Sequence, residues 1–171
     1  PPLAIVPGDK VVSWDFKGSH GDGGELQKRV RAEIARLESL LQNEKGEPTD
    51  YELYVSIANQ YTLLGDGANA YEYLGKALSI DSEKTGLAWY NMGTLLERLG
   101  APLTARIAYT KAVDAQSHIE QYHLARLSLL TKYFPDDTAA IEANFAQAET
   151  QLGPLPAILQ IKAAWLKEKK I

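Results

Sequence analysis

The sequence predicts an all-α fold of about eight antiparallel helices stacked into a solenoid. Apolar residues recur at helical spacing along most of the chain after residue 24. Small residues at Gly93 and Ala105 let two antiparallel helices approach closely beside the bulk of Trp89. Five pairs of matching residues also lie 35 positions apart, an offset that ordinary amphipathic helices have no reason to repeat. These pairs are Tyr54 and Trp89, Ala58 and Gly93, Gly65 and Gly100, Ala70 and Ala105, and Ala77 and Ala112.

Residues 1–24 are predicted to form an extended segment or linker, because prolines and glycines are frequent there. Val12, Trp14 and Phe16 alternate with polar residues as in a half-buried strand, yet no second strand-like segment exists to pair with them. We expect Trp14 and Phe16 to pack on neighbouring helices. The alternative is a tail that docks on another molecule.

The first helix is predicted at about residues 25–44, with Asp22 and Glu25 as a capping box at its start. Its charged side chains lie off the apolar stripe and are expected to face solvent. A second capping box, Thr49 with Glu52, begins the next helix. Helices are then expected at about 50–64, 67–80, 84–99 and 102–116.

The third unit diverges from the first two. Ser117 and Glu120 form another candidate capping box, and a helix is expected from there to Tyr133. Arg126 stands where a small residue is expected, and Pro135 replaces the glycine-containing turn of the earlier units.

Two further helices are predicted at about 137–151 and 154–170, and the first and last helices are expected to seal the two ends of the array. Ile161 and Trp165 make the last helix more apolar than a terminal cap needs. If both were exposed, they would offer a contact to a partner or to a second copy of the chain, giving a homo-oligomer through the C-terminal helix. The alternative is that both pack against the preceding helix.

The repeating unit resembles the tetratricopeptide repeat, whose pattern W-x2-L-G-x2-Y is followed by A-x3-F on a period of 34 residues. The matching residues are Trp89, Met92, Gly93, Leu96, Gly100, Ala105, Tyr109 and Ala112. The resemblance covers about residues 50–116 well and 119–152 weakly. It implies a right-handed superhelix within a repeat domain of residues 25–171, with units at about 51–83, 86–116 and 119–152.

In this family the first helices of successive units line a concave groove that holds the ligand. The resemblance implies the following groove residues: Asn59, Thr62, Tyr90, Asn91, Thr94, Glu97, Arg98 and His123. The family also has a carboxylate clamp of two asparagines and three cations. Asn59 and Asn91 match its asparagines, but Val55, Glu120 and Leu124 occupy the cation positions, so a terminal carboxylate would be poorly neutralised.

Composition excludes several other functions. The net charge of −4 argues against a nucleic-acid partner, and the absence of cysteine removes disulfides, thiolate nucleophiles and Cys-ligated zinc. His118 and His123 lie five apart, which does not place two metal ligands on one helix face. Ser19, His20 and Asp22 are adjacent in a linker rather than brought together by a scaffold, so we expect no catalytic residue, metal or cofactor.

The sequence therefore predicts a non-catalytic interaction module that holds a peptide or protein segment in its groove. The alternative is an accessory or assembly domain of a larger membrane-anchored or enzymatic protein, which would bind through its convex face or its N-terminal segment. No apolar run is long enough to span a membrane. The chain begins Pro1-Pro2 rather than Met, so we expect that a signal peptide, membrane tether, N-terminal domain or disordered tail preceded it. This favours a membrane-anchored or exported bacterial protein, with a cytoplasmic one left open.

Overall fold

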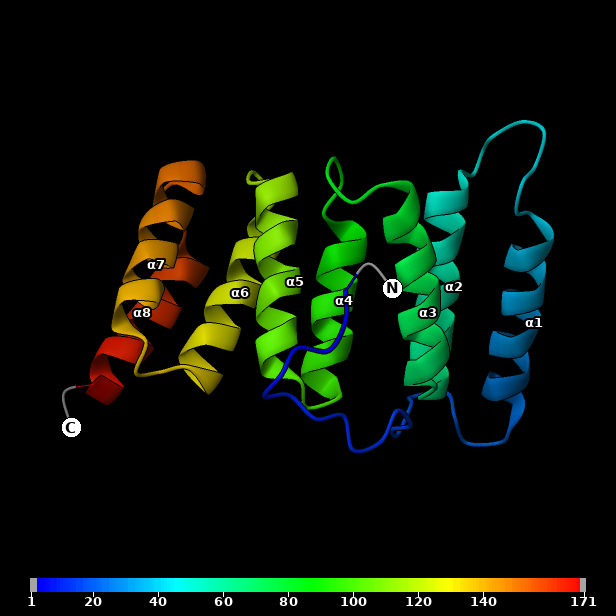
Figure 1. The fold of residues 1–171 in the computed structure, drawn as a ribbon, viewed down its shortest axis with the longest axis horizontal. Helices are drawn as coiled ribbons and strands as arrows, with labels where there is room; N and C mark the ends of the chain where they lie inside the picture. The colour runs from blue at the N-terminus through cyan, green and yellow to red at the C-terminus, as the bar shows by residue number, and fades with distance from the viewer. Residues whose placement is uncertain (1–2, 170–171) are drawn as a thin grey trace.

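A computed structural model describes residues 3–169, and residues 1, 2, 170 and 171 lie outside the description. Along the described residues eight helices follow one another and form an all-α solenoid, which confirms the predicted fold class (Figure 1). The helices are α1 (Glu25–Ser39), α2 (Asp50–Leu64), α3 (Gly67–Ile80), α4 (Leu87–Arg98), α5 (Pro102–Ala115), α6 (Glu120–Tyr133), α7 (Thr138–Leu152) and α8 (Pro156–Lys169).

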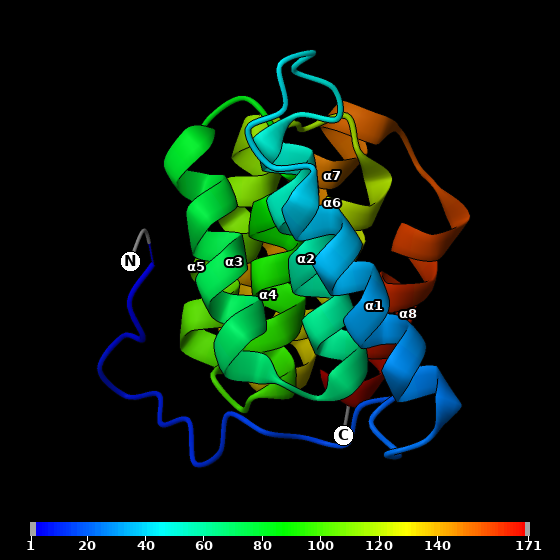
Figure 2. The ribbon, with the colours of Figure 1, turned by 90° about the vertical axis from the view of Figure 1, so that its right-hand side faces the viewer.

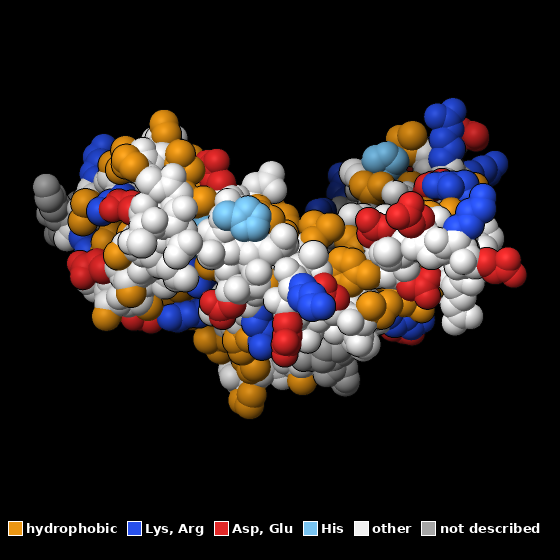
Figure 3. All heavy atoms as spheres, turned by 90° about the horizontal axis from the view of Figure 1, so that it is seen from above, with side chains coloured by type: hydrophobic (Ala, Val, Ile, Leu, Met, Phe, Trp, Pro, Cys, Tyr) orange, Lys and Arg blue, Asp and Glu red, His pale blue; other side chains and the backbone are white. Residues whose placement is uncertain are grey.

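The helices pack as antiparallel neighbours, α2 with α3, α4 with α5 and α6 with α7. α1 packs on α2 at one end of the row, and α8 packs on α6 and α7 at the other (Figure 1). Seen from above in Figure 3, the molecule is a curved body that is hollowed on one side. The two outer helices therefore cover the ends of the array, as the sequence predicts.

Buried apolar side chains form three clusters, because each unit touches only its neighbours. The largest cluster extends from α2 to α6 and holds Trp89, which is 2% exposed. A second joins α1 to α2 around Ile34 and Ile57, and a third joins α6, α7 and α8 around Phe145.

Gly93 lies directly against the ring of Tyr109, its partner on α5. A Cβ atom on Gly93 would lie 2.5 Å from two ring carbons of Tyr109, far inside van der Waals contact. Trp89 and Ala105 are buried beside this contact. The close approach of α4 and α5 therefore depends on the small residue, as predicted. In the third unit, where Arg126 takes that position, α6 and α7 approach each other much less closely than α4 and α5 do.

Two of the three predicted capping boxes are wrong. Thr49 and Glu52 form theirs at the start of α2. Gly24 is the N-cap of α1, and Asp22 instead accepts a hydrogen bond from the Gly24 N–H. α6 also begins without a side-chain cap, because Ser117 lies two residues before its N-cap and donates its hydroxyl to Gln151.

Three helix ends also differ from the prediction. α1 ends at Ser39 rather than near residue 44, because Gln42 adopts a left-handed conformation, with φ of 57°, and donates its N–H to Asp50. α4 begins at Leu87 rather than near 84, since Asp81 accepts the N–H groups of the following loop. α8 begins at Pro156 rather than 154, and its predicted end at residue 170 lies outside the described residues.

Of the two alternatives for the last helix, packing against the preceding helix holds for Trp165. Trp165 is 3% exposed, and its ring centroid lies 6.1 Å from that of Phe145 on α7. Ile161 is half-buried against the same cluster. Trp165 thus packs inward, whereas Ile161 stays partly exposed and lines a surface pocket together with Ala164.

The N-terminal segment docks on its own helices, which confirms the packing expected for Trp14 and Phe16. Both side chains are half-buried against the central cluster, and Leu3 is buried within it. Figure 2 shows the segment along the side of the molecule formed by α3 and α5, and then beneath the lower ends of the helices. We call residues 3–21 the strap.

Replacing Gly93 with leucine should destabilise the protein strongly, because Tyr109 leaves no room for the new side chain. We expect a loss of about 3 kcal/mol, at the upper end for overpacking, and a melting temperature lower by about 5–10 °C. Thermal unfolding followed by circular dichroism measures this. Ala143→Leu, at an exposed position of α7, is the matched control and should change little. An unchanged melting temperature in Gly93→Leu would contradict the close-approach argument.

Candidate peptide-binding groove

Five of the eight predicted groove residues line one pocket between α2 and α4. The pocket has a volume of about 90 Å³, and Leu74 and Leu95 supply its apolar lining. Its polar lining is Asn59, Thr62, Asn91, Thr94 and Arg98. The structure thus brings together residues that lie up to 39 positions apart in the chain.

Asn59 and Asn91 face each other across the pocket. The Asn91 Nδ2 donates to the Asn59 Oδ1 over 3.1 Å, so the first two units are bridged by one amide pair. This pairing leaves the Asn59 N–H groups and the Asn91 carbonyl oxygen for a ligand. The hydroxyls of Thr62 and Thr94 donate to backbone carbonyls one helical turn back, which leaves the Thr62 oxygen as an acceptor. The Thr94 oxygen also lies 3.4 Å from the Tyr109 hydroxyl.

Arg98 lies at the end of the pocket and is held by the strap. Its Nη2 donates to the Lys17 carbonyl oxygen over 2.8 Å, and its guanidinium carbon lies 4.4 Å from the ring centroid of Phe16. The strap therefore orients the cation that lines this end of the pocket.

Tyr90 and Glu97 lie outside this pocket and contact neighbouring helices. The Tyr90 ring centroid lies 5.3 Å from that of Tyr122 and 6.2 Å from that of Tyr109. Glu97 accepts a hydrogen bond from the Tyr109 hydroxyl over 3.0 Å. Burial of that hydroxyl raises the pKa of Tyr109, so it remains a donor at neutral pH. Both groove candidates thus take part in packing between α4, α5 and α6.

The prediction for His123 is wrong, because its side chain is fully buried and cannot reach a ligand in the groove. Its Nε2 lies 2.7 Å from the Ser117 carbonyl oxygen in the preceding loop, and its Nδ1 has no hydrogen-bond partner in residues 3–169. Burial lowers the pKa of His123, and the nearby Arg126 adds to this effect. The third unit departs from the 35-residue offset, so positions carried over from the first two units do not apply to α6.

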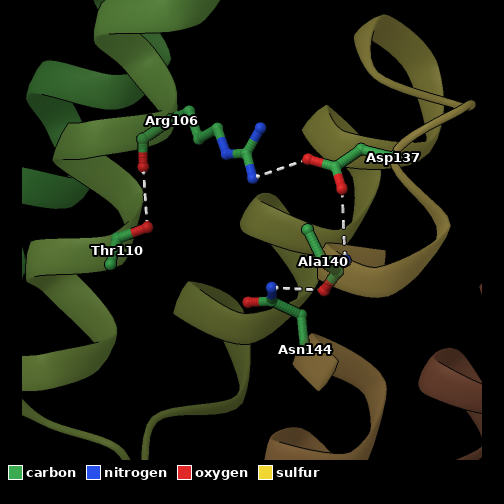
Figure 4. A network of polar contacts seen from close by, with 5 residues as sticks. All are labelled: Arg106, Thr110, Asp137, Ala140 and Asn144. Carbon is green, nitrogen blue, oxygen red and sulfur yellow. Dashed lines mark hydrogen bonds and ion pairs between the residues drawn. The ribbon is translucent and has the colours of Figure 1, made fainter. Parts of the chain in front are cut away.

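Polar contacts join the second unit to the third. Arg106 on α5 pairs with Asp137 over 3.1 Å, and Asp137 also caps α7 by accepting the Ala140 N–H (Figure 4). Within the third unit, Arg126 on α6 is 4% exposed and donates to Gln147 on α7 over 2.8 Å. Burial lowers its pKa to about 10, so Arg126 remains charged at neutral pH.

The other chemical candidates do not form sites in the described residues. Ser19 and His20 contact each other in the exposed linker, with 2.7 Å between Oγ and Nδ1, while Asp22 accepts from the Gly24 N–H. Residues 3–169 contain no group of three or more side chains suited to hold a metal ion. They also contain no helix that is long and apolar enough to cross a membrane.

Acid should destabilise the protein through His123. Because its pKa is lowered on folding, the unfolded chain takes up a proton below about pH 6.5 that the folded chain excludes. The free energy of unfolding is therefore highest above that pH and falls as the pH drops, by up to about 1.4 kcal/mol per unit. Urea unfolding at pH 7.5 and 5.5 should show this fall weakened in His123→Gln and retained in His118→Gln, an exposed control. Equal falls in the two variants would rule out His123 as the cause.

Comparison with known proteins agrees with the helical repeat fold. Residues 51–84 and 87–118 each match the family model of the tetratricopeptide repeat. No curated protein matches the chain. A solved structure described as the crystal structure of MamA covers 86% of this chain and 86% of its own, with a TM-score of 0.61 at 14% sequence identity, a likeness that shows the fold alone. Two tandem segments of the chain therefore match the tetratricopeptide repeat, and they lie within an all-α helical solenoid.

Proposed function

We propose that the chain is a non-catalytic interaction module that binds an extended peptide or protein segment across α2 and α4. Tetratricopeptide repeats generally mediate protein–protein interaction, and this proposal adds the place and the chemistry. It takes residues 25–171 as the repeat domain and residues 1–24 as the segment that packs on it.

The observation that carries the proposal is the amide pair of Asn59 and Asn91. Its remaining N–H and carbonyl groups match the alternating donors and acceptors of a peptide backbone. The Thr62 oxygen beside it adds an acceptor, and Arg98 adds one cation to the lining of the pocket. A peptide lying along the hollow would meet these groups in order from one unit to the next.

The size of the pocket also favours a peptide over a small molecule. Cavities that enclose drug-sized ligands have volumes of about 300–1,000 Å³. The pocket between α2 and α4 has about 90 Å³, which is room for a single side chain. A peptide could place one residue there and extend over the surrounding surface.

Tyr90 and Glu97 support this groove indirectly in our proposal, by fixing α4 against α5 and α6. In this structure the N-terminal segment is docked on the chain's own helices through Trp14 and Phe16, so the groove proposal does not use it as the ligand-binding element. His123 has no part in the site.

Removing both asparagines should weaken groove binding without unfolding the protein. The ligands are peptides selected on the wild type from a random library. We expect the double variant Asn59→Ala, Asn91→Ala to bind them at least about tenfold more weakly, because each substitution removes hydrogen bonds worth about 1 kcal/mol. Fluorescence polarisation of the selected, labelled peptides gives the affinities.

The matched control is Glu72→Ala with Lys76→Ala, an exposed ion pair on α3 whose removal leaves the net charge unchanged. This variant should bind the selected peptides as the wild type does. Peptides that bind the asparagine variant with wild-type affinity would move the site away from the groove.

A further inference from the structure

The second unit lacks a helix cap that the first unit has. In the first unit Asp66 caps α3, and its Oδ1 accepts the Asn69 N–H over 3.0 Å. The residue 35 positions later is Ala101, which has no side chain to cap α5. Asp9 of the strap supplies the missing carboxylate. Its Oδ1 accepts the Leu103 N–H over 3.2 Å, and its Oδ2 accepts the Thr104 N–H over 2.6 Å.

Thr104 has a buried hydroxyl whose hydrogen-bond partners both come from the strap. The side chain is fully buried. Its Oγ1 donates to the Asp9 Oδ2 over 2.6 Å and accepts the Val6 N–H over 3.1 Å. Because an unpaired buried hydroxyl is costly, this position is suited to a bound segment and poorly suited to an empty surface.

The turn between α2 and α3 holds the strap through its backbone. The Gly67 N–H donates to the Trp14 carbonyl over 2.8 Å, and the Phe16 N–H donates to the Gly65 carbonyl over 3.0 Å. Glycine is needed on this side of the contact, since a Cβ on Gly65 would lie 1.9 Å from the Phe16 carbonyl oxygen. Gly100, at the same place in the second unit, has no such neighbour within 4 Å.

Tyr71 on α3 provides a third contact with the strap, in addition to the first turn of α5 and the turn between α2 and α3. Its ring centroid lies 5.1 Å from that of Trp14, and its hydroxyl donates to the Leu3 carbonyl oxygen. Leu3 itself is 8% exposed. The strap is thus held by a carboxylate, an indole and backbone pairing, all at fixed spacing along an extended chain.

We infer that the surface formed by residues 63–67, Tyr71 and the first turn of α5, here called the strap site, is a second peptide-binding site of this protein. It recognises an extended segment with a carboxylate, an indole five residues later and a phenyl ring two residues after that. The occupant that fits it is the strap, and a second copy of the chain supplies the same segment in trans when the site's own strap is displaced.

The link between the strap and α1 supports exchange between copies. It consists of Asp22, Gly23 and Gly24, and a Cβ on Gly23 would meet nothing within 4 Å. Every strap contact described above is non-covalent and precedes this link. The link therefore raises the local concentration of the strap, while the strap contacts supply the affinity.

The test uses the full chain with its own strap weakened by Asp9→Ala and Trp14→Ala. The probe is a fluorescein-labelled synthetic peptide of residues 3–21. We expect saturable binding to this variant, and binding at least about tenfold weaker to the wild type, whose site is already occupied. A peptide carrying the same two substitutions should bind at least about tenfold more weakly, as expected for the loss of a helix cap alone.

Two further variants locate the bound peptide. Adding Gly67→Ala places a Cβ 2.4 Å from the Trp14 carbonyl oxygen and should remove binding. Adding Asn59→Ala and Asn91→Ala should leave binding unchanged, which separates this site from the proposed groove. Circular dichroism verifies folding, and Trp14→Ala alone replaces the double variant if that one unfolds. The inference is overturned if a folded strap variant shows no saturable binding, if Gly67→Ala has no effect, or if the asparagine substitutions remove binding.

Discussion

A pair of amphipathic helices cannot bury its apolar faces alone, and this constraint governs the whole structure. The α4–α5 pair closes because Gly93 admits the ring of Tyr109, which brings Trp89 and its neighbours into one buried cluster. That cluster then depends on the units at either side. The ends of the row are covered by α1 and α8, and Trp165 is buried for this reason rather than presented to a partner.

The same constraint explains why the pocket with the paired asparagines lies within the first two units. Ala58 and Gly93 allow each of these units to close, and the first helices then lie near enough for Asn59 and Asn91 to pair. In the third unit the long side chain of Arg126 replaces the small residue, and α6 and α7 stand further apart. His123 is buried there, so the polar row does not continue along α6.

The strap joins the two faces of the molecule. Its Asp9 completes α5 on one side, and its Phe16 and Lys17 hold Arg98 at the end of the groove on the other. A change in strap docking would therefore alter both the first turn of α5 and the orientation of the groove cation. This contact gives the two peptide sites of our proposals a physical connection, while each keeps its own test.

The sequence by itself determined the fold class and the paired repeats, because helical spacing and the 35-residue offset are properties of the chain alone. Asn59 and Asn91, which lie 32 positions apart, were expected in the groove from the resemblance to the tetratricopeptide repeat. The sequence also contained a signal for the strap, since Ala101 stands where the first unit has Asp66. Nothing in the sequence, however, linked that vacant cap to Asp9, which lies 92 positions earlier. Only the tertiary structure decided which side chains share a surface. His123, Asp9 and Trp165 received their roles from contacts between distant segments, and such contacts leave no local periodicity to read.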